Sequence, residues 1–150
     1  MKNWIKHVVA AGLAVAVIGA GIATTQPAYA DAVKDRRAAM KQMSKANKAI
    51  KKASKAGNMA AAQTQARIIV ATADKLAGLF PRGTDRGTLG KKATRAKPAI
   101  WSDWDTFKTK LGALRKVASN VAGGDMTAAK GIGKTCGGCH KAFRGKKAKK

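Results

Sequence analysis

Apolar residues recur along most of this chain at the three- and four-residue spacing that is typical of amphipathic helices. The first such stretch predicts a helix over residues 32–56, in which lysines surround a single apolar stripe. That stripe consists of Val33, Met40, Met43 and Ile50. Gly57 favours the end of this helix, and Asn58 favours the start of the next one.

A second helix is predicted over residues 59–79, and Pro81 ends it. Residues 81–97 contain three glycines, many charged residues and almost no apolar side chains, which indicates a long connecting loop. A loop of that length is uncommon in a compact domain, so we expect it to lie near a functional site.

The third helix is predicted to begin at the turn that contains Pro98, and it carries the strongest periodic pattern in the chain. Its stripe consists of Ile100, Trp104, Phe107, Leu111, Leu114, Ala118 and Val121. Gly123 and Gly124 then interrupt the helix, and Asp125 is a candidate N-cap for a fourth helix. Four amphipathic helices without a strand pattern predict an all-α fold, an antiparallel four-helix bundle.

The predicted fourth helix contains the sequence Cys-Gly-Gly-Cys-His at residues 136–140, a C-x-x-C-H motif. Helical geometry places Cys136, Cys139 and His140 on roughly one face, because they are three and four residues apart. Two thiols can add across the two vinyl groups of a haem, and the adjacent imidazole can then bind the iron. The motif therefore predicts one covalently attached haem c, with His140 as the proximal iron ligand.

A C-x-x-C pair also occurs in zinc sites and in dithiol oxidoreductases, but both interpretations fit less well here. A structural zinc ion requires four Cys or His ligands, whereas residues 31–150 supply only Cys136, Cys139 and His140. A thioredoxin-like motif follows a strand in an α/β pattern, and the sequence shows no such alternation. Covalent haem is therefore the favoured interpretation.

The first 30 residues have the pattern of a cleaved secretory signal peptide. Lys2 and Lys6 precede a mostly apolar run over residues 8–22, which is short for a membrane span. The run leads to a small-x-small pattern, so we expect cleavage after Ala30, with an uncleaved anchor as the alternative. Residues 31–150 are then expected to form a single domain with one core. The expected localisation is the periplasm, where exported chains with this motif meet haem.

The chain is strongly basic, with 31 Lys and Arg residues against seven Asp residues and a formal net charge of +24. Such a charge attracts anionic partners. Nucleic acid is the usual partner of a basic chain, but the predicted export argues against it. An acidic redox partner protein or an anionic membrane surface is expected instead. We expect the basic segment 144–150 to be a solvated chain end, with a contact to such a partner as the alternative.

The motif near the end of the chain, together with four predicted helices, resembles the class II c-type cytochromes, the group that contains cytochrome c′ and its low-spin relatives. Other similar segments are residues 31–40, 79–84 and 100–107. The sequence from Cys139 to Arg144 resembles the family's Cys-His-x-x-aromatic-Arg. The resemblance implies a four-helix bundle with one haem c, and it places Arg144 beside the proximal haem face.

The resemblance also makes Met40 decisive, because this position of the first helix meets the distal haem face in the family. In cytochrome c′ an apolar non-ligand is usual there, and the five-coordinate iron binds nitric oxide or carbon monoxide. In the low-spin branch the residue is Met, which binds the iron. Met40 is the expected distal ligand, and Met43 is a weaker competitor three residues on. The alternative is a gas-binding cytochrome c′ in which Met40 only lines the distal pocket.

The sequence therefore favours a periplasmic electron-transfer protein rather than an enzyme. Residues 31–150 contain no second histidine, no Glu and no clustered acid/base pair near the motif. A haem protein that docks on anionic lipid through its basic surface is a further hypothesis. The resembled family often forms homodimers through its first two helices, and the lysine density of the first helix here opposes that assembly.

Overall fold

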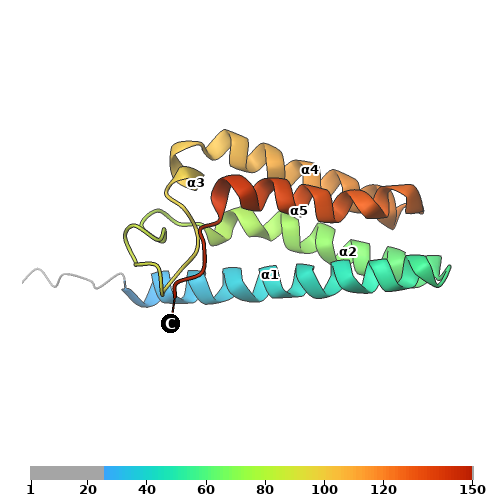
Figure 1. Cartoon of the computed structure of the whole chain (residues 1–150), viewed down its shortest axis with the longest axis horizontal. Coiled ribbons are helices and arrows are strands. Elements are labelled where there is room, and N and C mark those ends of the chain that lie inside the picture. Colours follow the sequence, from blue (N-terminus) through green and yellow to red (C-terminus); the bar gives the residue numbers. More distant parts are fainter. Residues whose placement is uncertain (1–25, 150) are drawn as a thin grey trace, which may run out of the picture.

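The computed structural model describes residues 26–149 and has the all-α bundle that the sequence predicts. The long helices α1 (Gln26–Lys55) and α2 (Met59–Leu76) form one antiparallel pair. Helices α4 (Trp104–Ala122) and α5 (Ala129–Phe143) form the second pair, which packs on the first (Figure 1). The described residues contain no strand, only an isolated antiparallel bridge between Ala96 and Arg144.

Helix α1 begins earlier than expected, at Gln26 rather than near residue 32. The helix therefore includes the bond between Ala30 and Asp31, at which we expect the signal to be cleaved. Most of the predicted signal, residues 1–25, lies outside the described part of the chain, so cleavage stays a prediction. Within residues 26–149, no helix combines the length and the apolar character that crossing a membrane requires.

The third predicted helix is not continuous, and that prediction was wrong at Asp103. A short helix α3 (Ala99–Ser102) ends there, because Asp103 has φ −131° and ψ 55°. Helix α4 starts at the next residue, and the Phe107 N–H donates to the Asp103 carbonyl oxygen at 3.1 Å. On α3, the Trp101 Nε1–H donates to the Phe80 carbonyl oxygen at 2.9 Å. This hydrogen bond ties α3 to the chain that follows α2.

The tight turns form where the sequence predicts them. Gly57 lies in the turn between α1 and α2 and has φ +69°, a conformation that glycine adopts without strain. The Asn58 side chain accepts a hydrogen bond from the Ala61 N–H at 2.9 Å and so caps α2. Asp125 accepts from the Thr127 N–H at 2.9 Å and starts the turn η2 (Met126–Ala128), which leads directly into α5.

The bundle is packed differently at its two ends. At the end with the short α1–α2 and α4–α5 turns, the helices bury a continuous set of apolar side chains. This set consists of Ile50, Ala62, Ala66, Ala118, Val121 and Ile132. Toward the other end, α5 fully buries no residue between Ile132 and Phe143, and α1 and α5 touch at few positions. The face of α5 that carries the C-x-x-C-H motif is therefore only partly covered by the core, and the rest of it borders a cavity.

Candidate haem site

A cavity of about 700 Å³ lies beside the motif, and a smaller one of about 140 Å³ adjoins it. The residues that line both are Met40, Ser44, Phe107, Cys139 and His140. The two cavities are therefore lobes of one space between the N-terminal half of α1 and the C-terminal half of α5. The larger lobe lies within the range of about 300–1,000 Å³ that is usual for cofactor pockets.

The motif residues are half-buried and face this space as their helical spacing predicts. Cys139 and His140 line both lobes, Cys136 lines the smaller one, and both thiols are free. Burial raises the pKa of both thiols. Burial also lowers the pKa of His140, with the charges of Arg144 and Arg95 acting in the same direction. The imidazole is therefore held neutral, which is the form that binds a metal ion.

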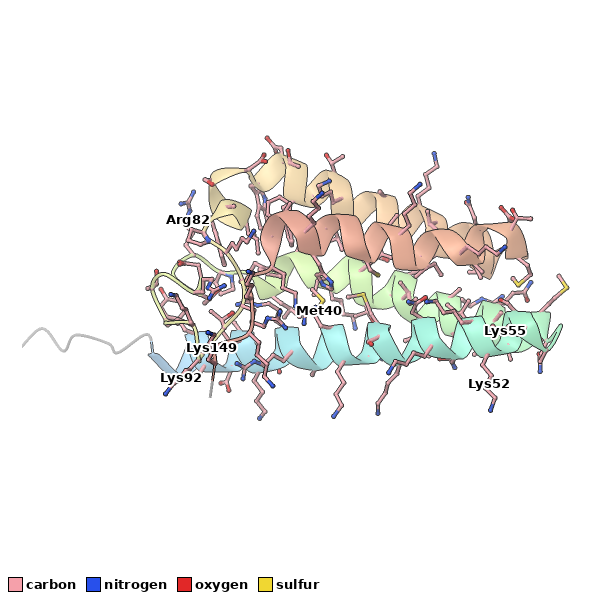
Figure 2. The ribbon with its side chains drawn as sticks, in the orientation of Figure 1. Met40, Lys52, Lys55, Arg82, Lys92 and Lys149 are labelled. Carbon is pink, nitrogen blue, oxygen red and sulfur yellow. The ribbon has the colours of Figure 1, made fainter. Side chains whose placement is uncertain are left out.

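Met40 extends from α1 into the space between α1 and α5 (Figure 2). It lines both lobes together with His140, from the facing helix. Met43 lines only the smaller lobe and is 6 % exposed, packed in the core. Of the two candidate methionines, Met40 is thus the one that shares the whole cavity with the histidine.

Three phenylalanine rings close the apolar side of the cavity. Phe107 meets Phe80 with ring centroids 4.8 Å apart and Phe143 with centroids 5.5 Å apart, both edge to face. All three rings are buried and line the larger lobe. They come from the loop after α2, from α4 and from α5, so the aromatic cluster joins the cavity wall to the core. Such a wall excludes water from a bound macrocycle.

Nine cationic residues also line the larger lobe, and the described lining contains no acidic residue. They are Arg36, Arg37, Lys41, Lys91, Lys92, Arg95, Arg144, Lys147 and Lys149. The loop supplies lining residues to this lobe, which confirms the prediction that the long loop lies near the site; they are Lys91, Lys92, Thr94, Arg95 and Ala96. A haem presents two propionate carboxylates on one edge, and guanidinium groups pair well with carboxylates.

Arg36 is the most unusual of these cations, because its residue is only 5 % exposed. Its guanidinium donates to the Thr84 hydroxyl at 2.8 Å and stacks 4.3 Å above the Phe80 ring centroid. Its Nε–H is buried without a hydrogen-bond partner. Burial, together with the nearby charge of Arg37, lowers the pKa of Arg36 to about 10. A buried cation without an anionic partner is costly, so this site is suited to receive a carboxylate.

Sequence reasoning missed Arg36, although the chain contains a signal for it. The residue lies three positions after Val33 and four before Met40, on the apolar stripe of the first helix. An arginine at a core-facing position is rarely buried unless it has a partner, so this position indicates a buried contact. Arg95 gave no comparable signal, because it lies in a loop without periodicity.

The expectation of a solvated C-terminal segment holds for Lys146, Lys147 and Lys149, which are exposed, but not for Gly145, which is buried and tied to the loop. The Gly145 N–H donates to the Arg95 carbonyl oxygen at 2.7 Å, and the Arg95 Nε–H donates to the Gly145 carbonyl oxygen at 2.8 Å. Lys147 and Lys149 consequently line the cavity. Arg144 lies directly after the end of α5 and lines the same lobe as His140.

The residues present fit a covalently bound haem. Two free thiols and a neutral imidazole face one cavity, and part of its wall is aromatic. The lining also holds a buried cation, Arg36, that pairs with no carboxylate among residues 26–149. A histidine is a common proximal ligand of haem iron, and haem proteins enclose the macrocycle in a largely apolar pocket. Fold and site together define a helical protein that carries haem c.

Comparisons with known proteins agree with this class. The family model described as Cytochrome C' matches residues 31–144. Cytochrome c' of Rhodopseudomonas palustris is 33% identical over 141 residues, which cover 88% of this chain and 92% of that protein. Cytochrome c-556 of Agrobacterium fabrum is 34% identical over 106 residues, 66% of this chain and 68% of that protein. The structure titled cytochrome c' from Rhodobacter Spheriodes has a TM-score of 0.67 at 26% identity, covering 79% of this chain and 98% of that chain.

The chain therefore belongs to the cytochrome c′ family of class II c-type cytochromes. Both names among its relatives, cytochrome c′ and cytochrome c-556, occur within this family. The cofactor that the sequence predicts, one covalently attached haem c with its iron, is the cofactor of this family.

Proposed function

We propose that this protein is a periplasmic electron carrier whose haem iron is bound by His140 and Met40. The observation that carries the proposal is the position of Met40, which lines both lobes of the cavity opposite the histidine. A thioether ligand favours ferrous iron and fills the sixth coordination position. Relatives from bacteria and the N-terminal sequence pattern support the periplasmic assignment.

The haem supplies the one-electron chemistry, and the side chains of this chain set the conditions for it. Cys136 and Cys139 would hold the macrocycle through thioether bonds, and His140 would bind the iron in its neutral form. Phe107, which lines both lobes, would keep water from the macrocycle and so limit reorganisation when the charge changes. Arg144, beside His140, is assigned to the proximal face because its charge bears on the same imidazole.

An absorption spectrum of the purified holoprotein tests the proposed ligation. Sharp low-spin ferrous bands, a weak far-red ferric band from sulfur-to-iron charge transfer and little change with carbon monoxide are expected for a His/Met site. Broad high-spin bands that shift readily with carbon monoxide would contradict the proposal. They would assign the protein to the five-coordinate, gas-binding type of cytochrome c′.

We further assign Arg36 to a haem propionate, and a substitution tests this role. The Arg36→Gln variant is expected to have a reduction potential lower by on the order of 50 mV, equivalent to roughly 1 kcal/mol for one electron. The physical reason is that a cation near the haem favours the state with one more electron. Redox titration of the holoprotein measures the shift.

The matched control for this test is Arg67→Gln, which removes the same charge from an exposed position on α2 outside the cavity lining. Its potential is expected to change little. Equal shifts in the two variants would show that net charge alone sets the potential and that Arg36 does not contact the haem.

A further inference from the structure

The cavity wall holds more positive charge than the haem can neutralise. Nine cationic residues line the larger lobe, whereas the two propionates of one haem carry two negative charges. Seven of the nine are exposed. One of the seven, Arg144, is assigned to the proximal haem face, and we call the other six the cationic rim. The cationic rim consists of Arg37, Lys41, Lys91, Lys92, Lys147 and Lys149. Its charge is therefore available to a partner outside the protein.

The fold brings the cationic rim together from three segments that are distant in the sequence. Helix α1 supplies Arg37, whose guanidinium donates to the Ala93 carbonyl oxygen. The loop supplies its two lysines from a turn at Gly90, where φ is +84° and the Ala93 N–H donates to the Gly90 carbonyl oxygen at 3.2 Å. These contacts order the rim before any partner arrives.

The third segment is the C-terminal one, and its anchor at Gly145 explains why its lysines reach the rim. Gly145 is buried, and Arg86 packs so closely over it that an added Cβ would overlap the guanidinium. The paired hydrogen bonds with Arg95 fix the backbone at this residue. Figure 2 shows Lys149 and Lys92 at the loop end of the bundle, and Lys52 and Lys55 at the opposite end.

We propose that the cationic rim is the docking surface for an acidic redox protein, which exchanges electrons with the haem through the mouth of the cavity. The inference rests on the proposed electron-transfer function and adds the location of the partner. A partner with a cluster of carboxylates is complementary in charge to the rim. Complementary charges accelerate encounter and orient the partner at low ionic strength.

The shape of the basic surface favours a protein partner over a membrane. The rim gathers its charges around one side of the haem cavity, so a compact cluster of carboxylates on a partner protein is complementary to it. A bilayer is broad and flat, and it would engage the exposed lysines that continue along α1 as far as Lys52 and Lys55. Docking on lipid would therefore not depend on the rim in particular.

Two triple variants, each of which loses three positive charges, distinguish an effect of where the charge lies from an effect of the net charge. The rim variant is Lys91→Gln/Lys92→Gln/Lys149→Gln, and the control variant is Lys48→Gln/Lys52→Gln/Lys55→Gln. All six lysines are exposed. The second-order rate of reduction of each ferric holoprotein by reduced flavodoxin, an acidic electron donor, is measured by stopped flow over a series of salt concentrations.

The rim variant is expected to react roughly tenfold more slowly than the unmodified protein at low salt, with a weaker salt dependence. The control variant is expected to slow by less than about twofold. Reduction by the cation hexaammineruthenium(II) should show no such slowing in either variant. Equal slowing of both variants by flavodoxin, or slowing of neither, would overturn the proposal.

A vesicle-binding experiment tests whether the rim binds an anionic membrane surface instead of a protein. Both variants are sedimented with phosphatidylcholine vesicles that contain roughly one-third phosphatidylglycerol. Loss of sedimentation by the rim variant, with an unchanged flavodoxin rate, would overturn the proposal in favour of a membrane surface. The absorption spectrum of each variant reports the iron ligands independently. Failure of the Met40 ligation would appear in that spectrum and not in the ratio of the two rates.

Discussion

Replacing Met40 by Leu is expected to change the haem iron from six-coordinate low-spin to five-coordinate high-spin. The apolar side chain preserves most of the volume at this position of α1 but removes the sulfur ligand. Carbon monoxide should then bind readily to the ferrous protein, and the reduction potential should fall by on the order of 0.1 V, within the range of about 0.8 V that axial ligands control. Absorption spectra and a redox titration measure the two effects.

The matched control is Met43→Leu, because Met43 lies on the same helix, is buried, and lines only the smaller lobe. We expect it to leave the spin state and the potential unchanged. If Met40→Leu leaves the low-spin spectrum intact, Met40 is not the ligand. If Met43→Leu alone produces the high-spin state, the ligand is Met43.

The second large effect is expected at Phe107, whose replacement by Ala should reduce the free energy of unfolding by about 3–5 kcal/mol. The residue is 2 % exposed, and its ring meets both Phe80 and Phe143 edge to face. It also stacks on Trp104 with centroids 5.2 Å apart. The substitution removes these contacts and enlarges the cavity. Denaturant unfolding of the holoprotein measures the change.

Phe107→Leu is the corresponding control, because it keeps an apolar side chain of intermediate size. Its cost is expected to be clearly smaller, about 1–2 kcal/mol. An equally small cost for Phe107→Ala would show that the haem or neighbouring side chains refill the space. The aromatic cluster would then contribute little to the stability of the bundle.

The features that the sequence predicted well are those that depend on local spacing. Cys136, Cys139 and His140 share a helix face because helical geometry alone fixes intervals of three and four residues. The cap at Asn58 likewise depends on backbone groups within one turn. The family resemblance added the candidate Met40, and the structure places this residue at the cavity.

The features that the sequence did not predict depend on contacts between distant segments. The helix break at Asp103 accompanies the attachment of Trp101 to the Phe80 carbonyl group. The position of the C-terminal segment depends on hydrogen bonds between Gly145 and Arg95, fifty residues earlier. Neither contact leaves a periodic signal, because loop backbones and chain ends have no fixed repeat.

The unequal packing of the two ends of the bundle also bears on the local stability of each end. At the end with the short turns, the helices meet through alanines and branched side chains without help from a cofactor. At the other end, they surround a space that holds the uncompensated charge of Arg36. Cooperative unfolding units are set by such differences in local packing. Local stability is therefore expected to be higher at the end with the short turns, whereas the stability of the other end is expected to depend on the bound cofactor.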